Sequence, residues 1–230
     1  MYLQQFIDID REMLLFFNGS HSDVTDMLAL VLTNAYTWIP LYVSMFWLVL
    51  KNNAKWSQIL LVVGASALCV LLASVLSASI VKPAIARLRP SFEPSLWGEV
   101  QLVRGYTANG YSFFSSHAAN TLSIAVFLSL VVRSQVFTRF MLLWSLVNCW
   151  TRLYLGVHYP SDILVGMCAG AVIGLVIYGI YIKLYMIVTD KLHYISSQYT
   201  RTGYAFSDID VVLTVMALTF VYALIRAVVS

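Results

Sequence analysis

Two histidines and one aspartate in this sequence have the types and the spacing that phosphoryl transfer requires. Of His117 and His158, one imidazole can attack phosphorus as a nucleophile while the other protonates the departing oxygen. Asp162 follows His158 by four residues, a spacing that lets its carboxylate hold the second imidazole nitrogen and fix the tautomer. These three residues predict chemistry on a phosphate ester.

Three cations accompany them at the ends of apolar stretches: Lys82, Arg89 and Arg152. Cations beside lipid are costly unless an anion compensates them, and phosphate suits this set, because arginine binds it bidentately and lysine adds a point charge. A helix that begins at Ser115 and Ser116 would also point free backbone N–H groups at the same anion. We therefore expect a phosphate site built from these five residues.

Bringing these side chains together requires helices that cross a membrane and return. His117 and His158 are 41 residues apart. A helix rises about 1.5 Å per residue through about 30 Å of hydrocarbon, so a round trip takes roughly 40 residues. Both histidines should return to the same membrane face, where the preceding apolar stretch also delivers Lys82 and Arg89.

Apolar stretches of the right length predict an all-α polytopic transmembrane bundle of about six spans, since a crossing needs about 20 residues. They are residues 27–50, 57–81, 115–132, 140–155, 163–182 and 209–229. The last stretch is the weakest, because Asp208, Asp210 and Arg226 lie in or beside it. Residues 1–20 combine an apolar face with charges, as expected of an amphipathic helix that lies on the membrane surface or caps the bundle.

The composition agrees with a membrane environment. Hydrophobic residues make up 60% of the chain, charged residues 11%, and the mean hydropathy is +0.79. Soluble domains carry about 25% charged residues. The net charge of +3 is spread out without a basic run, which argues against a nucleic-acid partner. Nothing in the sequence implies a protein partner.

The expected spans place seven Lys and Arg residues on each side of the membrane. If Lys82, Arg89 and Arg152 are present for chemistry, the remaining balance favours an outward-facing site by the positive-inside rule. We therefore expect a multi-pass protein of a bacterial inner membrane whose site faces the periplasm.

Three short motifs, in this order, resemble the type-2 phosphatidic acid phosphatase superfamily, which also includes vanadium haloperoxidases. The motif Lys, six residues, Arg-Pro reads KPAIARLRP at residues 82–90. Pro-Ser-Gly-His reads FSSH at 114–117, and Ser-Arg, five residues, His, three residues, Asp reads TRLYLGVHYPSD at 151–162. The resemblance covers roughly residues 26–185 and implies a single membrane phosphatase domain over 1–230.

The resemblance implies a role for each motif residue. His158 is expected to be the nucleophile that forms a phosphohistidine, Asp162 its orienting carboxylate and His117 the general acid. No metal or other cofactor is implied. The expected phosphate ligands are Lys82, Arg89, Ser115, the backbone at Ser116, and Arg152. The departures from the family pattern are Phe114 for Pro, Ser116 for Gly and Thr151 for Ser.

The expected reaction is hydrolysis of a lipid phosphate or pyrophosphate within the membrane. The family supports undecaprenyl pyrophosphate as the first candidate substrate, with lipid A and phosphatidylglycerol phosphate as alternatives. A lipid phosphotransferase would use the same phosphohistidine. An anion transporter would explain the cations, but it gives no reason for the spacing of His158 and Asp162.

A zinc hydrolase could use His117, His158 and Asp162 as ligands, but the three neighbouring cations disfavour it. Taken singly, each of these cations is more often an interface anchor whose charged end reaches the headgroups. Arg87 and Arg104 match no motif position, and we expect both to be such anchors.

Overall fold

The computed structural model describes residues 2–189 and 197–229, so Lys191 lies outside the described residues. Within these ranges there is no β-strand, only an isolated bridge between Tyr199 and Ala205, which confirms the expected all-α fold. The helices are α1 (Tyr2–Asn18), α2 (Asp23–Thr33), η1 (Ala35–Trp38), α3 (Ile39–Asn52), α4 (Trp56–Ser74), η2 (Val75–Val81), α5 (Lys82–Ile85), η3 (Pro90–Phe92), η4 (Pro94–Leu96), η5 (Val103–Gly105), α6 (Ser116–Val132), α7 (Gln135–Tyr154), α8 (Pro160–Val188) and α9 (Phe206–Val229).

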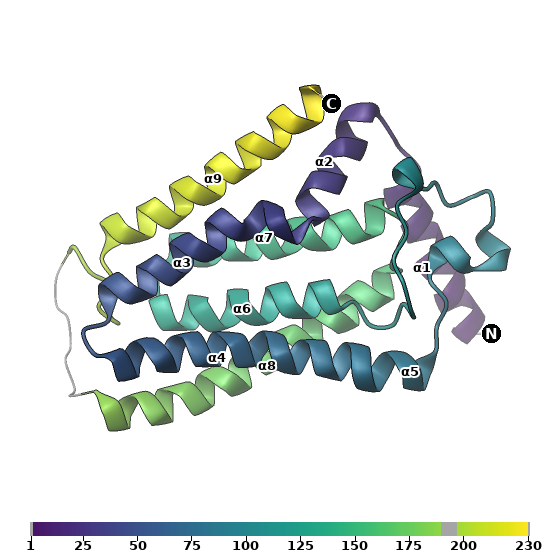
Figure 1. Ribbon diagram of the computed structural model, residues 1–230. Helices are drawn as coiled ribbons and strands as arrows, with labels where there is room; N and C mark the ends of the chain where they lie inside the picture. The colour runs from purple at the N-terminus through teal and green to yellow at the C-terminus, as the bar shows by residue number, and fades with distance from the viewer. Residues whose placement is uncertain (1, 190–196, 230) are drawn as a thin grey trace.

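The long helices run lengthwise in one bundle, with α6 packed against α4, α7 and α8 (Figure 1). At one end of the bundle lie α1, α5, the segment 86–115 and the turn that joins α7 to α8. The loops that join α3 to α4 and α6 to α7 lie at the opposite end. The first end, the site end, therefore collects all three sequence motifs.

The expected number of spans is confirmed only in part. Within the described residues, three helical runs are long and apolar enough to cross a membrane: Trp56–Leu96, Pro160–Val188 and Phe206–Val229. A fourth results if Asp23–Thr33 and Ala35–Asn52, bent by 69°, count as one span. The helix α6 is apolar but has only 17 residues, and α7 contains the polar side chains of Arg139, Asn148 and Arg152.

The bend between α2 and α3 has a local cause. Asn34 leaves the helical conformation, and its side chain accepts a hydrogen bond from the Tyr36 N–H (3.0 Å), which starts the short helix η1. Pro40 then stands in the first turn of α3, where its missing N–H costs nothing. The uncharged stretch 27–50 is thus two helices meeting at an angle rather than one straight helix.

Glycines on α8 bring this helix close to the backbone of α6. A Cβ added at Gly166, Gly170 or Gly174 would lie only 2.5–2.7 Å from a carbonyl oxygen of α6. Small residues four apart are a common way for membrane helices to pack closely. This seam fixes the start of α8, which carries Asp162, against the start of α6, which carries His117.

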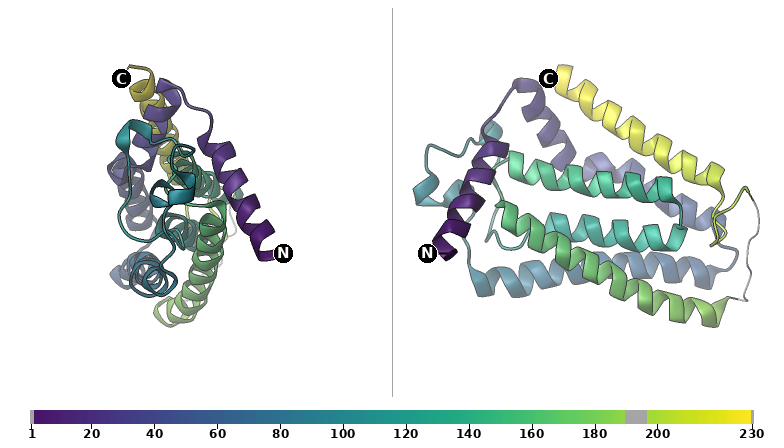
Figure 2. Two further views of the ribbon diagram at one scale, coloured as in Figure 1. Left: turned by 90° about the vertical axis from the view of Figure 1, so that its right-hand side faces the viewer. Right: turned by 180° about the vertical axis from the view of Figure 1, so that it is seen from behind.

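The helix α1 lies across the site end, inclined to the bundle (Figure 2), and contacts α7 and α8. Leu14 is buried with Leu96 and Tyr159, and the Asn18 amide donates to the Tyr154 carbonyl (2.7 Å). One face of α1 therefore caps the bundle. The opposite face leaves large apolar side chains exposed, among them Phe6, Ile9, Met13 and Phe16. A position at the membrane surface stays a prediction.

Candidate active site

The second apolar stretch, residues 57–81, ends at the site end, so the first motif, which follows it, lies there. It passes through the π-helical segment η2 into α5, which begins at Lys82 and ends where Ala86 adopts left-handed backbone angles (φ 50°, ψ 32°). Buried Ser77, within η2, donates to the Phe114 carbonyl (2.8 Å), so this run also fixes the segment just before α6. The chain then turns across the end of the bundle towards the α7–α8 turn.

His158 lies in that turn and is only 1% exposed. Its Nε2 is 3.2 Å from Arg89 Nη1, and its Nδ1 is 3.4 Å from Asp162 Oδ2. A guanidinium can only donate, so these neighbours favour the tautomer with the proton on Nδ1 and the lone pair on Nε2. Burial lowers the pKa of His158 to about 3, and the charges of Arg152 and Arg89 act in the same direction against Asp162. The ring is therefore neutral and its Nε2 can attack phosphorus.

Asp162 is fully buried and accepts hydrogen bonds on both carboxylate oxygens. The Tyr159 N–H (2.9 Å) and the Ser112 hydroxyl donate to Oδ2, and Arg87 Nη1 donates to Oδ1 (2.8 Å). The carboxylate thus caps the start of α8 and faces His158 at the same time. This position agrees with the expected orienting role.

Both motif arginines are buried and held by uncharged groups. Arg89 donates to the carbonyls of Asn109 (3.0 Å), Gly110 (3.0 Å) and Val157 (2.9 Å), which ties the 86–115 segment to the α7–α8 turn. Arg152 donates to the hydroxyls of two residues, Thr33 (2.5 Å) and Tyr106 (3.0 Å). Its buried Nε has no hydrogen-bond partner among the described residues. An unsatisfied buried donor of this kind is suited to binding an anion.

Lys82 and the two serines occupy the rest of the site. Lys82 is half-buried, and the charges that act on it are those of Arg89, Arg152 and Asp162. The Ser115 hydroxyl is fully buried and accepts from the Ala118 N–H (3.4 Å) as the N-cap of α6, a bond that leaves its own proton available to donate to an anion. The first N–H groups of α6 have no intrahelical backbone partner and can bind the same anion.

His117 stands in the first turn of α6 and lines a pocket of about 410 Å³. The charged or titratable groups that act on it are Arg152, His158, Lys82 and Arg89. All eight sequence-predicted residues thus gather at one end of the bundle. The pocket is lined by Thr33, Ala35, Trp38, Tyr42, Val70, His117, Asn120, Thr121, Ile124, Trp144 and Asn148.

Sequence reasoning missed several residues of this site. The prediction that Arg87 is an interface anchor is wrong, because it donates to the carboxylates of Asp10 (2.7 Å) and Asp162 (2.8 Å). Ser112 and Tyr106 were not predicted either. They lie in the irregular 86–115 segment, where no periodicity indicates which side chains turn inward. Only the place of Arg87 inside the first motif was a usable signal.

The arrangement can bind a phosphate and transfer it. Three cations and a helix N-terminus surround a neutral, oriented imidazole, and a second histidine lies nearby. No group of three His, Cys, Asp or Glu side chains in residues 2–189 and 197–229 is arranged to hold a metal ion. His158 Nε2, the atom a zinc ion would need, faces a guanidinium.

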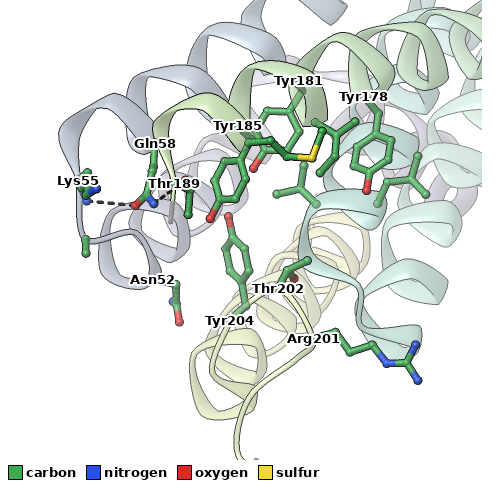
Figure 3. A pocket seen from close by; sticks show the side chains of 15 residues that line it. Asn52, Lys55, Gln58, Tyr178, Tyr181, Tyr185, Thr189, Arg201, Thr202 and Tyr204 are labelled. Carbon is green, nitrogen blue, oxygen red and sulfur yellow. Dashed lines mark hydrogen bonds between the residues drawn. The ribbon is translucent and has the colours of Figure 1, made fainter. Parts of the chain in front are cut away.

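A second pocket, of about 240 Å³, lies between α4, α6, α8 and the segment before α9 (Figure 3). Tyr185 and Tyr204 point towards each other across it, and Gln58 donates to the Thr189 hydroxyl (2.9 Å) at its edge. None of the eight predicted site residues lines this pocket. This pocket therefore lies apart from the predicted histidine site.

Comparisons with known proteins bear on what this site does. The sequence profile described as PAP2 superfamily matches residues 58–186. The chain is 39% identical over 178 residues to the lipid A 4'-phosphatase of Bacteroides thetaiotaomicron, covering 77% of this chain and 79% of that protein. It is 32% identical over 183 residues to the lipid A 4'-phosphatase of Porphyromonas gingivalis, covering 78% and 76%.

A solved structure has a similar fold. The crystal structure of Aquifex aeolicus LpxE superposes with a TM-score of 0.58 at 24% sequence identity, covering 73% of this chain and 93% of that chain. At this identity the likeness concerns the fold. The overall helical fold is thus shared with a chain of distant sequence.

Proposed function

Because the chain belongs to the PAP2 superfamily, we propose that this membrane lipid phosphatase acts on lipid A and removes its 4'-phosphate. The observation that carries the choice of substrate is the likeness to two lipid A 4'-phosphatases over more than three-quarters of the chain. The comparisons give undecaprenyl pyrophosphate, the first candidate from the sequence, no support. Phosphatidylglycerol phosphate also lacks support from them.

The shape of the pocket beside His117 supports a substrate with long chains. Apolar side chains such as Val70 and Ile124 line it, and a smaller pocket shares Tyr42 and Ile124 with it. The apolar space thus continues along α3, α4 and α6, away from the histidine. These apolar side chains would add little to the binding of a water-soluble phosphate, whereas an acyl chain would be buried against them.

In the proposed reaction, the phosphate lies among Lys82, Arg89 and Arg152, with oxygens on the first N–H groups of α6. His158 Nε2 forms a bond to phosphorus as the bond to the 4'-oxygen breaks. The proton on His158 Nδ1 stays directed at Asp162, which stabilises the cationic ring.

His117 supplies the proton that the departing 4'-oxygen takes up. It then accepts a proton from water, and the water oxygen attacks phosphorus and breaks the P–N bond. Inorganic phosphate leaves, and both imidazoles return to their starting state. The positive charge comes from side chains, so we propose that the reaction needs no metal ion.

The proposed location is a bacterial inner membrane with the site end facing the periplasm. Its support is the charge balance: once Lys82, Arg89 and Arg152 are assigned to the phosphate, more of the remaining basic residues lie towards the opposite end. The phosphate of a lipid at headgroup depth would reach the site end without leaving the bilayer.

Product analysis tests the reaction. Purified enzyme in detergent is incubated with bisphosphorylated lipid A, and mass spectrometry with fragmentation locates the phosphate that remains. We expect one equivalent of inorganic phosphate, loss at the 4'-position, and the same rate in EDTA. Phosphate recovered on a second lipid would identify a phosphotransferase, and activity lost to EDTA and restored by zinc would reject the mechanism.

A further inference from the structure

An ion-pair chain joins the N-terminal helix to the site. Arg87 lies between two carboxylates: its Nη2 donates to Asp10 Oδ2 (2.7 Å) and its Nη1 to Asp162 Oδ1 (2.8 Å). Asp10 belongs to α1, and Asp162 to the first turn of α8. Apart from Asp162, none of these residues occupies a specified position of a family motif, although Arg87 lies within the first motif. The reaction described above gives Arg87 and Asp10 no role.

The geometry around Arg87 is tightly defined. Asp10 is 4% exposed and Asp162 is not exposed at all, while the Arg87 side chain is 27% exposed. Ser161 connects Asp10 to Arg87: its N–H and hydroxyl donate to Asp10 (2.8 and 2.6 Å), and it accepts from Arg87 Nη1 (2.7 Å). The guanidinium also lies 3.7 Å from the centroid of the Tyr159 ring, which blocks its movement away from the pair.

We propose that Arg87 is a positioning residue for His158, and that Asp10 on α1 holds Arg87 in place and moderates its charge. The proposal rests on the proposed function in that His158 must accept the phosphoryl group. Arg87 binds Oδ1 of Asp162, which turns Oδ2 towards the imidazole. The amphipathic helix α1 thereby becomes part of the machinery that orients the nucleophile.

The charges explain why two carboxylates are needed. Asp10, Arg87 and Asp162 together carry one net negative charge, which faces the imidazole when it becomes cationic on bonding to phosphorus. If Asp10 lost its charge, Arg87 would neutralise Asp162 and this stabilisation would weaken. If Arg87 lost its charge, a fully buried carboxylate would have no guanidinium partner and would lose its fixed orientation.

The other groups around Asp162 do not substitute for Arg87. Ser112 and the Tyr159 N–H both donate to Oδ2, the oxygen nearest His158, whereas Arg87 is the side chain described on Oδ1. The charges of Lys82, Arg89 and Arg152 also face the site, but these are assigned to the phosphate. Changes at Arg87 and Asp10 should therefore alter kcat and leave KM unchanged.

The experiment compares Arg87→Gln, Arg87→Lys, Asp10→Asn and the double variant Asp10→Asn/Arg87→Gln in the full-length protein. Matched controls are Arg104→Gln, an exposed arginine of the same segment, and Asp8→Asn, an exposed aspartate of the same helix. For each, kcat and KM are measured on lipid A and on phosphatidic acid in detergent micelles. Thermal unfolding and ³²P bound to His158 after a rapid alkaline quench are measured on the same samples.

We expect Arg87→Gln to lower kcat and the rate of ³²P labelling by up to about a hundredfold, the loss that a misplaced reacting group causes. Asp10→Asn should give a smaller loss, and Arg87→Lys should recover part of the activity. The double variant should be no slower than Arg87→Gln, because the shared link is already broken. Both controls should match the wild type.

Two results would overturn the inference. One is wild-type kcat in Arg87→Gln with only a lower unfolding temperature, which would make the pair structural. The other is a loss confined to KM, which would assign Arg87 to the phosphate. If the wild type hydrolyses neither lipid, the proposed function fails instead, so the two failures are distinguishable.

Discussion

At the residue scale, the two histidines have different surroundings. His158 lies between a guanidinium on Nε2 and a carboxylate near Nδ1, and it is kept neutral by burial. His117 lines the pocket beside the site. The hydrogen-bond partners of His158 and the pocket position of His117 are the observations on which we base their proposed roles as nucleophile and general acid.

Replacing the histidines should give different losses. His158→Ala should abolish turnover on every substrate, because no other described group is placed to attack phosphorus. His117→Ala should slow lipid hydrolysis strongly, by roughly 10²–10⁴-fold, but slow an activated aryl phosphate much less, since that leaving group needs little protonation. Steady-state rates on both substrates check this. Equal losses on the two substrates would rule out His117 as the acid.

The pH dependence should reflect the low pKa of His158. Because this pKa is about 3, below the ordinary value, the imidazole stays neutral as the pH falls from 7 to 5. The test uses His117→Ala with an aryl phosphate, which removes the titration of the second histidine. We expect a nearly constant kcat/KM once the ionisation of the aryl phosphate itself is taken into account. A histidine with the ordinary pKa of about 6.5 would lose roughly twenty-five-fold in kcat/KM between pH 7 and pH 5, and that result would contradict the burial of His158.

The eight motif residues could be predicted from the sequence, because the residue types and their spacing within each motif match the family pattern. It could not predict Ser112 or the pairing of Arg87 with Asp10. Those contacts depend on how the irregular 86–115 segment turns and on α1 folding back over the site. The contact between the Ser115 hydroxyl and the Ala118 N–H was likewise not predicted, although a serine just before a helix is a common N-cap.

At the element scale, the seam between α6 and α8 determines the site geometry. The start of α6 carries His117 and the start of α8 carries Asp162, so their separation depends on how closely the two helices pack. The spacing Gly166, Gly170, Gly174 is visible in the sequence and was a usable signal for this packing. The bend at Asn34 was harder to predict, because the stretch 27–50 carries no charge and has the length of a single span.

Adding a methyl group in this seam should disturb both stability and activity. In Gly170→Ala the new Cβ would lie 2.5 Å from the Ala119 carbonyl oxygen, so the helices must separate. Overpacking of this kind costs about 1–3 kcal/mol. We expect a lower unfolding temperature in detergent and a lower kcat. Gly179→Ala, on the same helix with no atom within 4 Å, is the control and should behave as the wild type. Equal stability of the two variants would contradict the close packing.

At the scale of the whole molecule, the bundle has two unlike ends. The site end is covered by α1 and the 86–115 segment, and the opposite end carries the tyrosine-lined pocket and the short loops that join α3 to α4 and α6 to α7 (Figures 1 and 3). Composition predicted a membrane protein, because its low charge cannot cover a surface in water. The apolar stretches predicted about six spans, of which three within the described residues, or four with the bent pair, are long and apolar enough to cross a membrane. The others stay predictions, because α6 is short and α7 carries polar groups into the bundle.

The orientation of the two ends can be measured by cysteine labelling. Cys69, Cys149 and Cys168 are first replaced, and a single cysteine is placed at Glu99 or at Ala54, both exposed. If the site end faces outward, the cysteine at 99 reacts with an impermeant thiol reagent in spheroplasts and the one at 54 reacts only after lysis. The reverse labelling would invert the proposed topology.

We propose that this site removes phosphate from a membrane lipid and prefers lipid A. The most direct measurement is kcat/KM for lipid A, undecaprenyl pyrophosphate and phosphatidylglycerol phosphate in matched micelles, with glucose 6-phosphate as the soluble control and His158→Ala as the blank. We predict that lipid A gives the highest value and glucose 6-phosphate the lowest by a wide margin. A higher value for another lipid would overturn the choice of lipid A. Glucose 6-phosphate turned over as fast as the lipids would contradict the account.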